Sequence, residues 1–304
     1  MLNHATAQGG IVESLAGARL YEDGGQGNEC HHTHERHGRE ACHRPVPVGA
    51  ARNTVVDRGH EIGRFPVGAD ARLGPVEALD NPVWQALTGP HATVAEGGAF
   101  ARRYRPEYSV WSAVHDDADP AAWSEMRAIV GPGGHALFSG HPRHPTNWTV
   151  DRQFQIRQLV LDHPIDNRSP RGVTDRIRLL GPADASAMAV LAETTKPGPW
   201  CARTPELGNF FGIDDDGGLA AMAGERLQLP TAVEISGVCT DERARGHGYG
   251  AALVVTVATQ IQARGALPFL HVREANTDAI RLYERLGFRV RLLKCVALLR
   301  APED

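Results

Sequence analysis

Residues 233–250 read VEISGVCTDERARGHGYG, and this stretch decides the fold of the second half of the chain. Residues 233–239 alternate apolar and polar side chains well enough to predict a β-strand. A polar turn with glycines at positions 246, 248 and 250 comes next. Apolar side chains then recur at helical spacing from Leu253 to Ile261. The sequence therefore predicts a strand, a glycine-rich turn and a helix in that order.

A glycine-rich turn that enters a helix is suited to bind phosphate. The three glycines remove Cβ atoms that would keep a ligand away from the backbone. Amides at a helix N-terminus point outward and carry partial positive charge, and Arg243 and Arg245 can add full charges at the rim. The spacing lacks the longer glycine interval of the dinucleotide fingerprint and the Gly-Lys-Ser/Thr ending of a P-loop. Such turns also serve plain helix entry, so the turn alone leaves both interpretations open.

Two blocks of sequence together resemble the GNAT superfamily of N-acetyltransferases. Residues 243–248 (RARGHG) are similar to the acyl-CoA pyrophosphate loop of that family, Arg/Gln-x-x-Gly-x-Gly/Ala. Residues 276–288 (NTDAIRLYERLGF) are similar to its block Asn-x-x-Ala-x-x-Leu-Tyr-x-x-x-Gly-Phe. Residues 234–240 (EISGVCT) resemble the branch related to glycine N-acyltransferases, whose members often carry a second α/β half before the acetyltransferase half. The resemblance covers residues 174–300.

The resemblance implies the GNAT acyl-CoA N-acyltransferase fold, a mixed α/β fold with a mostly antiparallel sheet flanked by helices. We expect residues 174–304 to form this domain. In residues 64–165 a capped helix begins at Asp119-Pro120, and the apolar runs at residues 136–138 and 154–161 read as strands, which predicts a preceding small α/β domain. Residues 1–63 are rich in glycine, histidine and arginine, and we expect a low-complexity, disordered extension.

The extension contains a cluster of cysteine and histidine residues. Residues 30–37 read CHHTHERH, and Cys42-His43 follows. These are the usual ligands of zinc, but the spacing matches no standard zinc motif and no core pattern surrounds it. The alternative is a biased tail that binds metal weakly. We expect no metal to be required for activity.

The resemblance also implies a reaction, the transfer of an acyl group from acetyl-CoA to a primary amine by direct attack in a ternary complex. The amine must be neutral to attack, and the leaving thiolate must be protonated or stabilised. Tyr283 aligns with the tyrosine that acts as general acid in many family members, and its alternative role is an aromatic core residue at helical spacing. Glu234 is the candidate base, acting through water, and its alternative is a surface or ion-paired glutamate.

The resemblance further implies which residues contact the cofactor. Backbone amides near residues 238–240 are expected to hold the pantetheine and phosphate ends, and Asn276 to contact the pantetheine arm or to cap a helix. Alternation puts Glu234 and Val238 on one face of the strand unless a bulge intervenes. Cys239 and His271 are interpreted as core or sheet-face residues rather than a nucleophile and a base. The expected acetyl-CoA-binding residues are Val238, Cys239, Thr240, Arg243, Arg245, Gly246, His247, Gly248, Tyr249, Gly250, Asn276 and Tyr283.

Composition limits the partners and the compartment. The 304 residues include 32 Lys and Arg and 36 Asp and Glu, a net charge of −4 that argues against broad binding of nucleic acid. We see no apolar run of the ~20 residues that a membrane span needs and no secretory signal. Five scattered cysteines are typical of a reduced protein, so we expect a cytoplasmic one.

The expected acceptor is a small-molecule or peptide amine. We expect no nucleic-acid or membrane partner, and whether the chain forms homo-oligomers stays open. Two alternatives to the acetyl-transfer hypothesis also stay open. The chain could use a longer acyl-CoA, or it could be a non-catalytic CoA-binding regulatory module, which the presence of Tyr283 disfavours.

Overall fold

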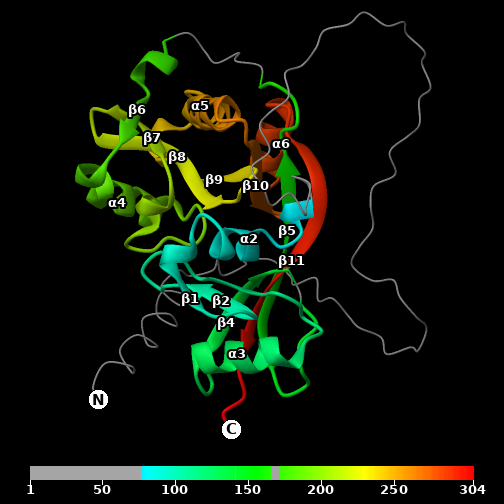
Figure 1. Cartoon of the computed structure of the whole chain (residues 1–304). Coiled ribbons are helices and arrows are strands. Elements are labelled where there is room, and N and C mark those ends of the chain that lie inside the picture. The colour runs from blue at the N-terminus through cyan, green and yellow to red at the C-terminus, as the bar shows by residue number, and fades with distance from the viewer. Residues whose placement is uncertain (1–76, 141, 166–171) are drawn as a thin grey trace, which may run out of the picture.

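The computed structural model describes residues 77–140, 142–165 and 172–304, and they form a sheet flanked by helices (Figure 1). The sheet of the described residues has 11 strands in the order β1-β2-β3-β4-β11-β5-β10-β9-β8-β7-β6. Eight of its ten pairings are antiparallel, and β3/β4 and β9/β10 are the parallel ones. The expected mixed α/β fold with a mostly antiparallel sheet is thereby confirmed. The strands are β1 (Ala95–Gly97), β2 (Ala101–Tyr104), β3 (Trp111–Val114), β4 (His135–Ser139), β5 (Thr149–Val160), β6 (Arg178–Leu180), β7 (Phe210–Asp215), β8 (Gly218–Gln228), β9 (Ala232–Thr240), β10 (Leu267–Arg273) and β11 (Arg289–Arg300).

Local sequence explains where the helices begin. The Asp119 carboxylate accepts a hydrogen bond from the Ala121 amide, and Pro120 is the first helical residue, as predicted. The Asn276 side chain caps the last helix in the same way, through the Ala279 amide. The α-helices are α2 (Pro82–Thr88), α3 (Pro120–Val130), α4 (Ala185–Thr195), α5 (Tyr249–Ala263) and α6 (Thr277–Arg285). The 3₁₀ turns are η1 (Glu77–Leu79), η2 (Ala92–Val94), η3 (Thr174–Arg176), η4 (Pro182–Asp184), η5 (Thr204–Leu207) and η6 (Glu242–Ala244).

Helices cover both faces of the sheet around β8, β9 and β10 (Figure 1). Helix α5 packs on one face, where Val233, Ile235 and Leu270 meet its buried side chains. On the opposite face α2 packs around Phe269, and α4 packs against Met222 and Cys239. Because strand neighbours alternate between faces, Glu234, between Val233 and Ile235, points toward the α2 and α4 side.

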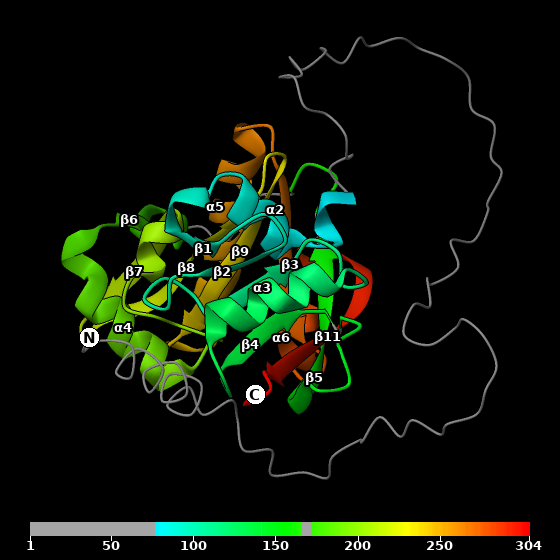
Figure 2. The same ribbon diagram turned by 60° about the horizontal axis from the view of Figure 1, so that its bottom comes forward.

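The two halves of the described chain repeat one arrangement. In each, a helix precedes three antiparallel strands, and a second helix then leads to a fourth strand that lies parallel to the third. Each half also lends its last strand to the other, since β11 pairs with β4 and β5 pairs with β10. Strands β5 and β11 lie side by side at the centre of the sheet (Figure 2). We propose 64–165 and 174–304 as the division into two domains, with a shared sheet.

The expected strand at 154–161 is β5, and it begins earlier, at Thr149. Sequence reasoning left β7, β11 and the strands from β1 to β3 without a prediction. No helix of the described residues is long and apolar enough to cross a membrane. The predicted extension at residues 1–63 and its cysteine and histidine cluster lie outside the described residues.

Candidate active site

Strands β9 and β10 pair over only part of their length. The parallel register joins Ala232 to Leu267 and ends with Ile235 opposite Leu270. Beyond that point β9 continues to Thr240 and β10 to Arg273 without pairing to each other. We call this opening, residues 236–240 and 271–273, the fork. It leaves backbone groups and side chains of both strands free to line a binding site.

A β-bulge shapes the β9 side of the fork. Cys239 pairs with Met222 and Ser236 with Gly224, so Gly237 and Val238 together face one residue of β8. Gly237 has φ +63°, and a Cβ there would lie 2.9 Å from Cε1 of Phe210. The bulge reverses the alternation, and Val238 packs with the α5 cluster rather than beside Glu234. Val238 therefore follows the bulged alternative that the sequence left open.

The turn predicted to bind phosphate, residues 243–250, is here called the glycine loop. Gly246 and Gly248 have φ of +84° and +78°, in the left-handed region that favours glycine. A Cβ on Gly246 would meet nothing within 4 Å, so the loop is open on that side. Amides 246–251 donate to no acceptor in the described part of the chain, and the first to do so is that of Ala252. A run of free amides at a helix N-terminus is a site for an anion.

The two arginines of the glycine loop differ in how they are held. Arg243 Nε lies 3.0 Å from Asp241 Oδ1, and this pairing lowers the pKa of the Asp241 carboxyl. Arg245 is exposed and makes no ion pair with another described residue. Of the two arginines, Arg245 is therefore the one whose charge is not already paired with a described carboxylate. At the other end of the loop, Gly250 lies against β9, because a Cβ there would be 3.6 Å from Thr240 Oγ1.

A pocket of about 270 Å³ lies beside the glycine loop. Arg176 of η3 donates hydrogen bonds to the Tyr249 hydroxyl at 2.5 Å and to the Asp214 carbonyl at 2.6 Å. The pocket is lined by Arg176, Asp215, Asp216, Arg243, Ala244, His247 and Tyr249. Three of the residues predicted to bind acetyl-CoA thus meet in one hollow of mixed charge.

Helix α6 places Tyr283 in the core under α5. The side chain is 8% exposed, and its ring packs edge-on against Phe288 at 6.1 Å. Burial, with a smaller contribution from nearby Cys239, raises the pKa of Tyr283 to about 12. The phenol is therefore protonated at neutral pH, so it can give up a proton but does not act as a base. The core packing is present, and the role as general acid stays a prediction.

Cys239 and Asn276 have clear structural roles. Cys239 is buried with α4, and burial raises the pKa of its thiol to about 11, so it is not a thiolate nucleophile at neutral pH. This confirms its interpretation as a core residue. Asn276 caps α6 through its hydrogen bond with the Ala279 amide. Cofactor contacts of both residues stay predictions.

Glu234 is fully buried in a bidentate ion pair. Both carboxylate oxygens accept hydrogen bonds from Arg226 at 2.9 Å, and Oε1 also accepts from His271 Nδ1 at 2.7 Å. A second bulge builds this pair, since Arg226 and Leu227 of β8 together face Glu234. Burial alone would raise the pKa of Glu234, but Arg226 and His271 outweigh it and lower the pKa to about 2. The ion-paired alternative is thus present, and the role as base stays a prediction.

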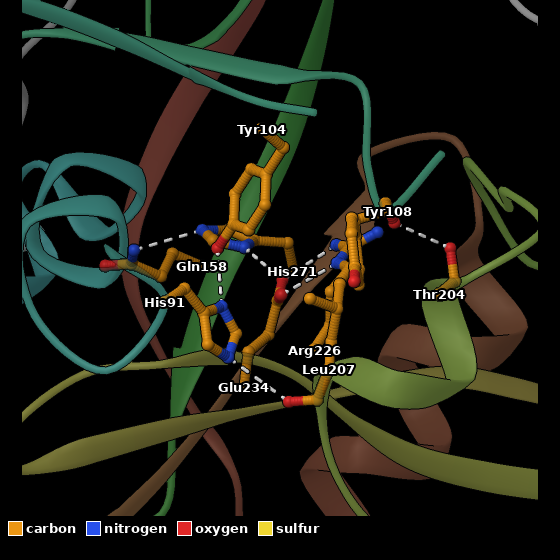
Figure 3. A network of polar contacts seen from close by, with 9 residues as sticks. All are labelled: His91, Tyr104, Tyr108, Gln158, Thr204, Leu207, Arg226, Glu234 and His271. Carbon is orange, nitrogen blue, oxygen red and sulfur yellow. Dashed lines mark hydrogen bonds and ion pairs between the residues drawn. The ribbon is translucent and has the colours of Figure 1, made fainter. Parts of the chain in front are cut away.

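The ion pair belongs to a larger polar network that joins the two halves of the chain (Figure 3). His271 contacts Gln158 of β5 at 3.0 Å, and Gln158 donates to the Leu79 carbonyl at 3.0 Å. Separately, His91 contacts the Tyr104 hydroxyl at 2.8 Å and the Leu207 carbonyl at 3.2 Å. Through Gln158, the N-terminal half therefore contacts His271 of the fork.

The N-terminal half also touches the loop between α4 and η5 and the start of η5. The Arg203 amide donates to the Glu107 carbonyl at 2.7 Å, and Thr204 Oγ1 donates to the Tyr108 carbonyl at 2.9 Å. Trp200 packs edge-on against Phe210 at 5.5 Å. The wall on this side of the fork is therefore built from both halves.

Sequence reasoning missed Gln158 and Arg226 and set His271 aside. These residues lie on β5, β8 and β10, so no spacing in the sequence connects them to Glu234. No local signal marks these three residues, because β5, β8 and β10 each carry other polar or charged side chains.

Known proteins are similar to this chain in sequence and fold. The profile described as FR47-like protein matches residues 210–297. A solved structure assigned as an acetyltransferase from the GNAT family of Novosphingobium aromaticivorans is 36% identical, with a TM-score of 0.64. That match covers 73% of this chain and 97% of the other. A GCN5-related N-acetyltransferase from Kribbella flavida is 16% identical with a TM-score of 0.51, over 77% of this chain and 98% of that one, and supports the fold alone.

A curated relative gives a shorter match. The mycothiol acetyltransferase of Streptosporangium roseum is 45% identical over 56 residues, which are 18% of this chain and only 17% of that relative. Membership of the family is shown instead by the Novosphingobium protein, because its 36% identity to this chain extends over 97% of its length. This chain belongs to the GNAT family of acetyltransferases.

Proposed function

We propose that the chain is an acetyl-CoA-dependent N-acetyltransferase that moves acetyl to a primary amine by direct attack in a ternary complex. The observation that carries the proposal is the glycine loop, whose free amides 246–251 begin α5 beside the fork. Bound there, acetyl-CoA would supply the activated acetyl thioester. The donor set suits it, because successive amides and the unpaired Arg245 match the charge of a pyrophosphate.

The residues around the fork divide the remaining work. The backbone groups of residues 238–240 that face away from β8 and the Asn276 side chain would hold the pantetheine arm. Tyr283, buried and protonated, would donate its proton to the departing thiolate. Positioning two substrates in the fork would supply much of the acceleration, so no covalent enzyme intermediate is needed.

The group that takes the proton of the amine is the less determined part. We keep Glu234, acting through water, as the candidate base. Its three hydrogen bonds and lowered pKa favour a different contribution, in which the carboxylate fixes Arg226 and His271 under the fork. The pH dependence of a Glu234 variant separates these two roles.

The finer assignments rest on sequence. We propose that the chain belongs to the branch related to glycine N-acyltransferases, on the basis of residues 234–240 and the preceding α/β half. The proposed acceptor is a small-molecule or peptide amine in the cytoplasm, and the net charge of −4 gives no support for a nucleic-acid partner.

The proposal is tested by mixing the full chain with acetyl-CoA and a set of primary amines. Free thiol is followed with a disulfide reagent, and the products are identified by mass spectrometry. We expect thiol release that depends on an amine and a product that has gained one acetyl group. Tight binding of acetyl-CoA without turnover of any amine would favour the non-catalytic CoA-binding module. Faster turnover with a longer acyl-CoA would show that acetyl-CoA is not the preferred acyl donor.

A further inference from the structure

The hydrogen bonds of Gln158 determine how its carboxamide is oriented. Its Oε1 accepts from Arg291 Nη1 at 2.7 Å, and an arginine can only donate. Its Nε2 faces the Leu79 carbonyl at 3.0 Å, which can only accept. Gln158 Nε2 is therefore the donor in the 3.0 Å contact with His271 Nε2. The side chain is completely buried, so water does not offer it other partners.

This orientation fixes the protonation of His271. Nε2 of the ring accepts from Gln158, so the ring proton is on Nδ1, where it is donated to Glu234. An imidazolium would carry a proton on Nε2 as well, so the Nε2–H of His271 would face the Nε2 amide donor of Gln158 with no acceptor between them. Burial lowers the pKa of His271, in the same direction, although the hydrogen bond with Glu234 opposes it.

His271 is at the place where this matters for the reaction. It is the first residue of β10 beyond the last pair, Ile235 and Leu270, and thus begins the fork. Its partner Glu234 is on β9, just before the fork opens. The orientation of His271 and Glu234 therefore determines which groups line the closed end of the fork, where the two substrates would meet.

We propose that Gln158 is a positioning residue of the acetyl-transfer site, which holds the neutral Nδ1–H tautomer of His271 and through it the Glu234 carboxylate. Gln158 is on β5, which the N-terminal half lends to the sheet, and Leu79 of η1 fixes it. The N-terminal half thereby completes the floor of a site whose phosphate loop and tyrosine lie in the other half. The inference rests on the proposed function.

Several charged groups surround the His271 ring and can affect the pH at which it titrates. Glu234 of β9 and Arg226 of β8 face it from one side, and Arg291 and Lys294 of β11 from the other. Asp80 pairs with Arg291, and its carbonyl accepts from Lys294 Nζ at 2.9 Å. Tyr104 and His91 lie nearby on the N-terminal half, Tyr104 within the field of Glu234. Of all these groups, only Glu234 and Gln158 hydrogen-bond the ring.

Two variants test whether Gln158 acts by donating a hydrogen bond to His271 or only by filling space. Gln158→Glu keeps the shape but replaces the NH₂ donor by an acceptor, which stabilises the imidazolium. Gln158→Leu removes all three hydrogen bonds of the side chain, to Leu79, His271 and Arg291. Gln155→Glu and Gln155→Leu are matched controls, because Gln155 is exposed on the same strand. Each protein is checked by thermal melting and by its Kd for acetyl-CoA, which we expect to stay within about twofold of native because the glycine loop is untouched.

The first readout is independent of activity. Nitrogen chemical shifts of ¹⁵N-histidine-labelled protein, with His271 assigned by a His271→Gln variant, report the tautomer and its titration. We expect the native ring to be neutral with the proton on Nδ1 at pH 7, and the Gln158→Glu ring to titrate at higher pH. An imidazolium or an Nε2–H tautomer in the native chain would overturn the proposal.

The second readout is kinetic. We expect kcat to fall about tenfold in Gln158→Leu, with KM for acetyl-CoA little changed, and the acidic limb of kcat to move to higher pH in Gln158→Glu. Gln158 variants with the kcat and pH profile of their Gln155 controls would refute the positioning role. If the native chain acetylates no amine, the proposed function fails, and the nitrogen shifts still decide whether Gln158 sets the tautomer.

Discussion

The turn between β3 and α3 and the turn between β9 and α5 occupy equivalent places in the two halves, yet they have opposite character. In the C-terminal turn, glycines leave amides 246–251 without acceptors among the residues that the structure describes. In the N-terminal turn, residues 115–119 read HDDAD. There Asp116 accepts from the Ala118 amide at 2.9 Å and Asp119 from the Ala121 amide at 2.8 Å. The comparison teaches that strand order alone does not make a phosphate site, because the turn residues decide whether its amides are free.

The largest expected effect comes from removing that difference. Gly246→Glu combined with Gly248→Glu puts side chains at positive φ and adds carboxylates beside the free amides. We expect acetyl-CoA binding to weaken by at least about 100-fold, measured by calorimetric titration. Gly218→Glu is the matched control, since Gly218 also has positive φ (+99°) and open surroundings. Equal loss of binding in the control would remove the case for the glycine loop.

A second contrast is that between a buried and an exposed ion pair of the C-terminal half. Glu234→Gln leaves the buried Arg226 uncompensated, and we expect the free energy of unfolding to fall by about 3 kcal/mol, measured by urea denaturation. Glu206→Gln, which breaks the exposed pair with Arg203, should cost much less, because water screens that pair. Comparable losses would contradict the anchoring role of Glu234. If Glu234 is the base, its variant also loses the acidic limb of the pH–rate profile.

Tyr283 belongs to the half that carries the glycine loop. Tyr283→Phe keeps the ring packing against Phe288 but removes the proton donor. We expect kcat to fall about 100-fold with the Kd for acetyl-CoA unchanged, since general acids contribute on this scale. Steady-state kinetics and calorimetry on the same preparation check both values. Full turnover by the variant would leave the tyrosine with its packing role alone.

The polar network that joins the halves should make stability depend on pH. Burial lowers the pKa of His91 and His271 below 6.5, so the unfolded state binds more protons and stability falls as the pH drops below about 6.5. Glu234 has its pKa lowered from 4.5 to about 2, so its contribution is complete above about 4.5 and is lost toward pH 2. Urea denaturation between pH 8 and pH 4 should show the first decline, and a flat curve over this range would argue against neutral buried histidines.

The smallest effect is expected in the N-terminal turn. Asp119→Ala removes the cap of α3 and should cost about 1 kcal/mol of unfolding free energy, measured by thermal and urea denaturation. Acetyl-CoA affinity should not change. A change in affinity would show that this turn takes part in cofactor binding after all.

Much of the C-terminal half could be predicted because its signals are local. Residues 233–250 predict β9, the turn and α5, and Asn276 marks the start of α6. The exchange of β5 and β11 could not be predicted, because pairing between strands so far apart in sequence leaves no local pattern. Gln158 and Arg226 were missed, and His271 was set aside, for the same reason, since only folding brings them to Glu234. The bulge at Gly237 was left open, because alternation cannot locate an inserted residue.

The most direct test of the glycine loop as the cofactor site is the stoichiometry of acetyl-CoA binding to the native full chain. Calorimetric titration should give one equivalent per chain, because free amides and uncommitted positive charge meet in the glycine loop and the equivalent turn is closed by aspartates. Two equivalents would show that the N-terminal turn also accepts the cofactor. No binding by a folded chain would contradict the assignment of the loop and of the enzyme built on it.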